Sequence, residues 1–67
     1  MSPRRLKTVL KQLRKDRGWS QAKLAEEADV TNAYIAQLET GKKKNPSLDV
    51  LKRLARALGV PMGELLE

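Results

Sequence analysis

The 67-residue sequence contains no cysteine and no histidine. These two absences exclude disulfides, thiol chemistry, the usual zinc sites and a histidine general base. Phenylalanine is also absent, so the only aromatic side chains are Trp19 and Tyr34, and a core must be built from aliphatic residues. No stretch approaches the roughly 20 apolar residues that a membrane span needs, and no apolar segment follows the basic start of the chain, as a secretory signal requires. We therefore expect a cytoplasmic protein that binds no metal or cofactor.

The length and the net charge of the chain further limit the classes of function that it can have. Single domains typically run from roughly 50 to 200 residues, so we expect one domain over residues 1–67, with no room for a separate catalytic domain. Fourteen lysines and arginines oppose eight acidic residues, and the net charge of +6 predicts a polyanionic partner. The charge is uneven: residues 1–17 hold seven cations and one acid, whereas residues 18–41 hold one cation and four acids. Residues 42–67 hold six cations and three acids.

Apolar residues recur at helical spacing, beginning with the stripe Leu6, Val9, Leu10 and Leu13. Hydroxyl residues that suit helix N-caps precede the second, third and fourth helices at Ser20, Thr31 and Ser47. Helix ends are expected at or next to Gly18, Asp29, Gly41 and Gly59. A last turn or short fifth helix follows Pro61. No segment alternates with the period of a strand, so the sequence predicts an all-α, compact five-helix bundle.

The junction between the second and third helices is the most informative local feature. Only Asp29 and Val30 separate Ala28 from the Thr31 cap. So short a connection forbids a long antiparallel hairpin and forces a steep crossing, which predicts a helix-turn-helix over about residues 20–40. The outward side of the third helix then carries short polar and methyl side chains of the kind that a DNA major groove accepts.

The segments Ser20–Ala25 and Ile35–Lys42 strongly resemble the helix-turn-helix domain of the Cro/repressor (XRE) family. Residues 45–48 and 54–60 continue the resemblance, which covers nearly the whole chain. It implies a lambda-repressor-like five-helix fold that binds double-stranded DNA, usually as a dimer on a palindromic operator. One departure is Asp29, where the family commonly has glycine; aspartate tolerates the left-handed backbone region better than most residues.

The resemblance also implies roles for individual residues. The base-reading positions correspond to Asn32, Ala33 and Gln37: Asn and Gln can pair with adenine through two hydrogen bonds, and an alanine methyl can meet a thymine methyl. Gln21 corresponds to a glutamine that anchors to phosphate. The residues expected to contact or position the DNA backbone are Ser20, Gln21, Thr31, Tyr34, Lys42, Lys43, Lys44 and Ser47.

Two further expectations concern assembly of the fold and of a dimer. The family pairs an arginine of the first helix with a glutamate late in the third, here Arg14 and Glu39; from the residues alone, an exposed pair of little energetic value is equally open. The C-terminal segment holds more apolar surface than a small bundle readily hides, which predicts a homodimer through Val60, Met62, Leu65 and Leu66.

Together these features predict a sequence-specific DNA-binding transcriptional regulator, a repressor rather than an enzyme. An antitoxin of a toxin–antitoxin pair, which binds a toxin protein through another surface and autoregulates its operon, has the same sequence features. This alternative stays open at the level of the sequence.

Overall fold

The computed structural model describes residues 3–66, with side chains from Leu6 onward. Its elements are five helices: α1 (Pro3–Asp16), α2 (Gln21–Ala28), α3 (Asn32–Thr40), α4 (Leu48–Leu58) and α5 (Gly63–Leu66). The described part of the chain is all-helical, as predicted, while residues 1, 2 and 67 of the expected domain lie outside it. None of these helices has the length and apolar character to cross a membrane.

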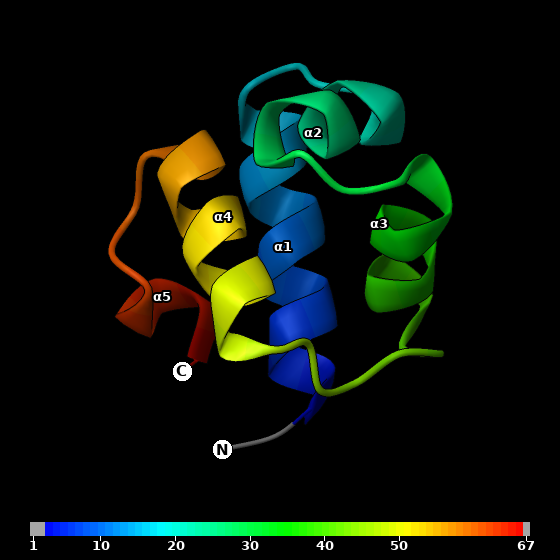
Figure 1. Ribbon diagram of the computed structural model, residues 1–67, viewed down its shortest axis with the longest axis vertical. Coiled ribbons are helices and arrows are strands. Elements are labelled where there is room, and N and C mark those ends of the chain that lie inside the picture. The colour runs from blue at the N-terminus through cyan, green and yellow to red at the C-terminus, as the bar shows by residue number, and fades with distance from the viewer. Residues whose placement is uncertain (1–2, 67) are drawn as a thin grey trace.

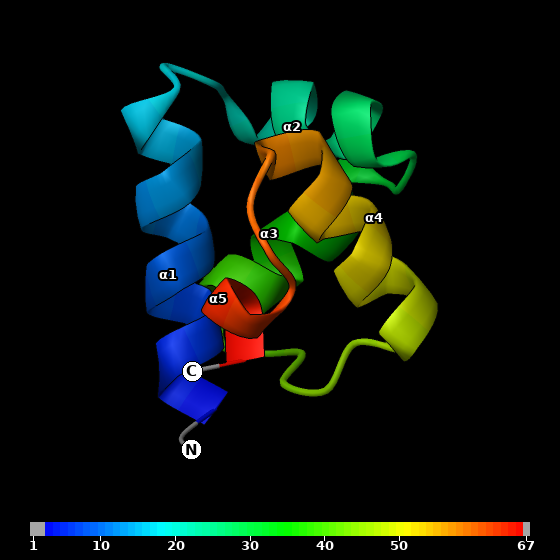
Figure 2. The same ribbon diagram turned by 90° about the vertical axis from the view of Figure 1, so that its left-hand side faces the viewer.

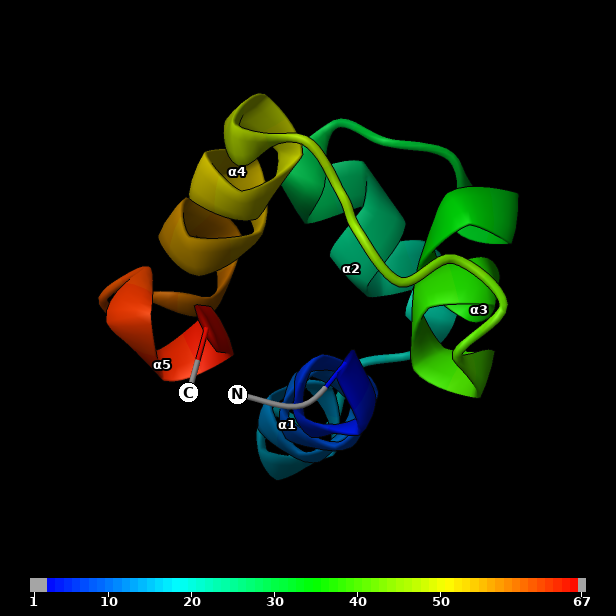
Figure 3. The same cartoon turned by 90° about the horizontal axis from the view of Figure 1, so that it is seen from below.

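The helices surround one small core of buried side chains, and Figure 1 shows how they are arranged. α2 lies across the C-terminal end of α1, and α3 and α4 lie on opposite sides of the bundle (Figures 1 and 3). α2 packs against both α3 and α4, whereas α1 packs against α3 and α5. The short α5 lies beside the N-terminal half of α1 (Figure 2). α3 is thus held by both α2 and α1.

The core is aliphatic, as the shortage of aromatic residues predicts. Its largest fully buried side chains are Leu10, Leu24, Ile35, Leu38, Leu54, Leu58 and Leu65. Trp19 and Tyr34 are only partly buried and pack against its edge. Leu65 is 1% exposed, which corrects the expectation that it faces a partner chain: α5 folds back onto α1 and uses this side chain to close the protomer's own core.

The predicted helix caps are confirmed. The hydroxyl oxygens of three residues accept hydrogen bonds from backbone N–H groups in the first turns of α2, α3 and α4, at 3.0, 3.1 and 3.2 Å: Ser20, Thr31 and Ser47. Three helices end in residues with left-handed backbone geometry, Asp29, Gly41 and Gly59. These contacts are local in sequence, which is why the element boundaries were predictable.

The turn between α2 and α3 is held from outside by α4. Asp29 has φ 58° and ψ 47°, the conformation that glycine adopts without strain. The guanidinium of Arg53 on α4 donates a hydrogen bond of 3.0 Å to the backbone carbonyl of Asp29. Arg53 also forms an ion pair of 3.1 Å with Asp49, one turn earlier on α4. A residue 24 positions away therefore fixes the turn that orients α3.

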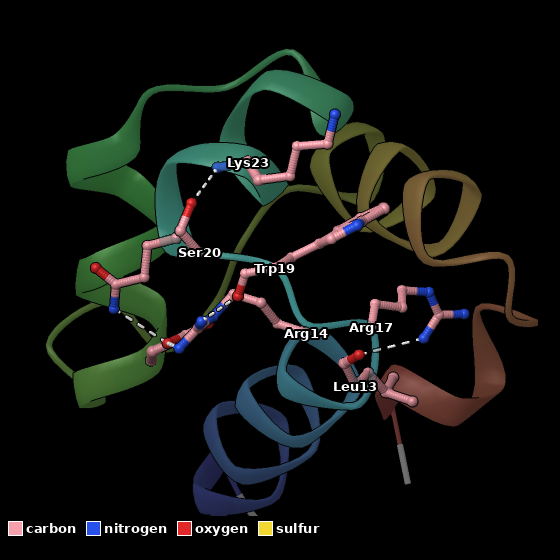
Figure 4. A network of polar contacts seen from close by, with 8 residues as sticks. Leu13, Arg14, Arg17, Trp19, Ser20 and Lys23 are labelled. Atoms are coloured by element: carbon pink, nitrogen blue, oxygen red, sulfur yellow. Dashed lines mark hydrogen bonds and ion pairs between the residues drawn. The ribbon is translucent and has the colours of Figure 1, made fainter.

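A buried ion pair ties α1 to the end of α3. Arg14 donates from Nε and Nη2 to the two carboxylate oxygens of Glu39, at 2.7 and 2.9 Å, and from Nη1 to the carbonyl of Trp19 at 2.7 Å (Figure 4). Arg14 and Glu39 are 8% and 7% exposed. The hydrogen bonds to Glu39 raise the pKa of Arg14 above its usual value, although burial opposes this. The pair is therefore buried, and the alternative of an exposed pair is excluded.

The Asp29 turn makes a prediction about stability. Asp29→Gly should raise the free energy of unfolding by about 0.5–1 kcal/mol, because glycine adopts the left-handed region without the side-chain penalty. The hydrogen bond from Arg53 to the Asp29 carbonyl is kept, and the lost ion pair of 3.9 Å between Arg53 and the exposed Asp29 carboxylate contributes little. Asp29→Ala is the matched control: it also removes the carboxylate but keeps a Cβ, so it should lower stability by about 1 kcal/mol. Urea titration of both variants measures the difference, and equal stabilities would contradict the strain.

The buried ion pair makes a second prediction. Glu39→Ala should lower the free energy of unfolding by about 3–5 kcal/mol, since it leaves the Arg14 charge buried without a partner. The double variant Arg14→Met with Glu39→Leu removes both charges and should recover most of that loss. Thermal unfolding followed by circular dichroism compares the two. A single variant that loses under about 1 kcal/mol would mean that the pair behaves as a surface pair.

Candidate nucleic-acid interface

α3 separates an apolar inner face from a polar outer face. Ile35 and Leu38 are 0% and 1% exposed and face the core. The opposite side, which we call the outer face, consists of Asn32, Ala33, Ala36, Gln37 and Thr40. Its side chains are short or slender, so nothing on this helix obstructs the approach of a grooved surface. The three predicted base-reading residues lie together on this face: Asn32 and Ala33 are exposed, and Gln37 is half-buried.

The predicted backbone contacts at Ser20, Thr31 and Ser47 are the three helix N-caps. Each hydroxyl oxygen accepts a backbone hydrogen bond within its own helix. A hydroxyl can accept and donate at the same time, so its own hydrogen is free to point to an external oxygen. All three residues are exposed. The capping geometry therefore leaves these residues able to donate to phosphate, in addition to their structural role.

The lysine loop, residues 42–44, is attached to α3 at two points. The backbone N–H of Lys43 donates to the carbonyl of Gln37 at 3.0 Å. The ammonium of Lys43 lies 5.4 Å from the centre of the Tyr34 ring, a cation–π contact. Tyr34 thus supports a lysine as well as packing on the core. These two contacts hold Lys43 beside α3, and its neighbours Lys42 and Lys44 are exposed on the same loop.

The predicted role of Gln21 is a phosphate contact, and the structure adds a second role within the fold. Its side-chain amide donates to Glu39 at 3.1 Å, so the first residue of α2 joins the Arg14–Glu39 pair. Gln21 is half-buried, and one amide hydrogen and the amide oxygen do not take part in that bond. The contact between Gln21 and Glu39, like that between Arg53 and the Asp29 carbonyl, has no local sequence signal, because its partners are 18 and 24 residues apart.

The negative charge of residues 18–41, which hold four acidic residues and one cation, is partly neutralised by contacts within the fold. The carboxylate of Glu39 accepts hydrogen bonds from Arg14 and Gln21. Glu27 forms an ion pair of 3.0 Å with Lys23, one turn earlier on α2, which raises the pKa of Lys23. Neither carboxylate lies on the outer face of α3. The outer face of α3 therefore carries no acidic side chain.

The C-terminal segment exposes little apolar surface to solvent. Val60 and Met62 pack partly against the core. Leu66, at 36% exposed, and Leu48 at the start of α4, at 57%, are the exposed large hydrophobic residues of the described chain. Of the four predicted dimer contacts, Leu66 is therefore the one with substantial free apolar surface. Leu48 lies at the start of α4, outside the C-terminal segment.

Comparisons with known proteins show which family shares this sequence. A family model described as helix-turn-helix, HTH_3, matches residues 10–65. The HTH-type transcriptional regulator SinR of Bacillus subtilis is 36% identical over 58 residues, which cover 87% of this chain and 52% of SinR. An immunity repressor protein of Bacillus phage phi105 is 37% identical over 57 residues, 85% of this chain and 39% of the repressor. The chain thus spans about half the length, or less, of these curated relatives.

A solved structure agrees with the sequence relatives. SinR in complex with DNA superposes with a TM-score of 0.89 at 34% identity, covering 92% of this chain and 98% of the SinR chain in that crystal. The match therefore extends over the complete bundle and not only over α2 and α3. The chain belongs to the HTH_3 family of helix-turn-helix domains, which are of the Cro/repressor (XRE) type.

Proposed function

We propose that this chain is a cytoplasmic, sequence-specific regulator of transcription that binds double-stranded DNA and acts as a repressor. The observation that carries the proposal is the outer face of α3, where Asn32, Ala33 and Gln37 lie together and no acidic residue shares the face. The relatives support it, because one is named a transcriptional regulator, another an immunity repressor, and SinR was crystallised with DNA.

In this proposal, different residues recognise the bases and bind the phosphate backbone. Asn32 and Gln37 can each form a bidentate pair with adenine, and the methyl group of Ala33 can contact that of thymine. Each good pair contributes about 1–3 kcal/mol of discrimination against a wrong base. The lysine loop and the N-terminal caps of α2, α3 and α4 supply contacts to phosphate that do not depend on sequence.

We further propose that two copies bind a palindromic operator as a homodimer. One helix-turn-helix reads one half-site, and a two-fold dimer reads two half-sites about 34 Å apart, one turn of the double helix. The C-terminal segment around Leu66 is the proposed contact, with Val60 and Met62 at its edge. Leu65 takes no part, since it is buried within the protomer.

Replacing Gln37 tests the reading role. Gln37→Ala should reduce discrimination at one base position by about 1–3 kcal/mol and leave binding to non-specific duplex nearly unchanged. The measurement is binding-site selection from random duplexes, followed by titration of the selected operator and of single-base variants. If all sequences weaken equally, Gln37 is not a base reader.

Lys43→Ala, in the neighbouring lysine loop, is the matched counterpart. It should weaken selected and random duplexes alike and reduce the slope of log affinity against log salt concentration by about 0.9, the value for one phosphate contact on duplex DNA. The Lys43 backbone bond to Gln37 survives the substitution, so the loop keeps its attachment. An unchanged slope would make the lysine loop a solvated segment without a role in binding.

The dimer is tested by removing exposed apolar surface at two places. Leu66→Ser should weaken self-association in sedimentation velocity and lower the affinity for a palindromic operator more than for a single half-site. Leu48→Ser removes the other exposed large hydrophobic residue, at the start of α4, and should leave association unchanged. A wild-type chain that stays monomeric both free and on the operator contradicts the dimer.

A further inference from the structure

An open groove of about 530 Å³ runs between α1 and the C-terminal end of α3. We call it the α1–α3 groove; its lining residues are Lys7, Thr8, Lys11, Gln12, Lys15, Glu39 and Thr40. Thr40 belongs to the outer face of α3, three residues beyond Gln37. The groove therefore begins where the candidate base-reading surface ends.

The groove is positively charged. Its three lysines follow one another at intervals of four residues, so they lie on one side of α1 and about 6 Å apart along its axis. Within residues 6–66 none of them forms an ion pair. Lys11 and Lys15 are exposed, while the stem of Lys7 lies against Gly41 at the end of α3. A row of this kind presents several cations to one extended anion.

The one carboxylate in the lining is already neutralised. Both oxygens of Glu39 accept hydrogen bonds from Arg14, at 2.7 and 2.9 Å, and one also accepts from Gln21 at 3.1 Å. Its charge is therefore balanced by the buried guanidinium and does not oppose an anion beside Lys11. The pair that holds α3 in place is also what allows a glutamate to line a cationic groove.

The groove and the lysine loop lie on opposite edges of the outer face. Tyr34, which supports Lys43, and Glu39, which lines the groove, are five residues apart on α3, or about 140° around the helix axis. That shorter arc contains the buried Ile35 and Leu38. The outer face occupies the remaining arc of about 220° on the solvent side. A helix that enters a major groove is bordered by the two strands of the duplex, one on each side.

We propose that the α1–α3 groove binds the phosphate backbone of one DNA strand, while the lysine loop binds the other. Lys11 and Lys15 are the principal contacts, and Lys7 extends the row toward the end of α3. This inference rests on the proposed function, because it needs α3 to face the duplex. It adds a phosphate site on α1, whereas the proposed function places the backbone contacts in the helix caps and the lysine loop.

The test is the salt dependence of binding by the double variant Lys11→Gln with Lys15→Gln. Glutamine keeps the helix propensity of these exposed positions while removing both charges. On a mixed-sequence duplex longer than one helical turn, the slope of log affinity against log salt concentration should fall by about 1.8, or about 0.9 for each phosphate contact. Base discrimination, measured on the selected operator, should persist because the outer face is unchanged.

The matched control is Lys52→Gln with Arg56→Gln, which removes two exposed cations from α4, beside the second groove that α4 forms with α2. It should leave the slope close to that of the wild type. Equally reduced slopes for the two double variants would overturn the inference, since net charge alone would then explain the change. An unchanged slope in the first variant would also overturn it, since Lys11 and Lys15 would then contact no phosphate. A wild-type chain that binds no duplex would instead contradict the proposed function itself.

Discussion

The Arg14–Glu39 ion pair is the contact on which the placement of α3 depends. It is buried, bidentate and extended by Gln21 and by the carbonyl of Trp19, so it joins α1, the α1–α2 connection, the start of α2 and the end of α3. A buried charge tolerates few alternative arrangements, because any geometry that separates the partners leaves a charge without compensation. The core is small and aliphatic, and aliphatic contacts alone define orientation less sharply.

A second set of contacts holds the other end of α3. The Thr31 cap fixes its first turn, and Arg53 binds the carbonyl of Asp29 just before that turn. Because α4 supplies this bond, the turn is held by the bundle and not only by its own residues. α3 is therefore constrained at its N-terminus by α4 and at its C-terminus by α1, which is the rigidity that base recognition requires.

The distribution of charge follows from this architecture. Carboxylates within residues 18–41 are paired or lie away from the outer face of α3, and cations stand along its edges. Short polar side chains in the centre suit recognition of base edges, whereas flanking lysines suit phosphates. The net charge of +6 is thus less informative than its location.

The sequence by itself determined the number and boundaries of the helices, the caps at Ser20, Thr31 and Ser47, and the grouping of Asn32, Ala33 and Gln37, because these depend on spacing and on bonds within three or four residues. The resemblance supplied the Arg14–Glu39 pair, but its burial came from the fold. Only the tertiary structure decided that Leu65 is core, that Arg53 holds the Asp29 turn and that the lysines of α1 border α3. These relations join residues distant in the chain, and no local pattern encodes which distant helix faces will meet.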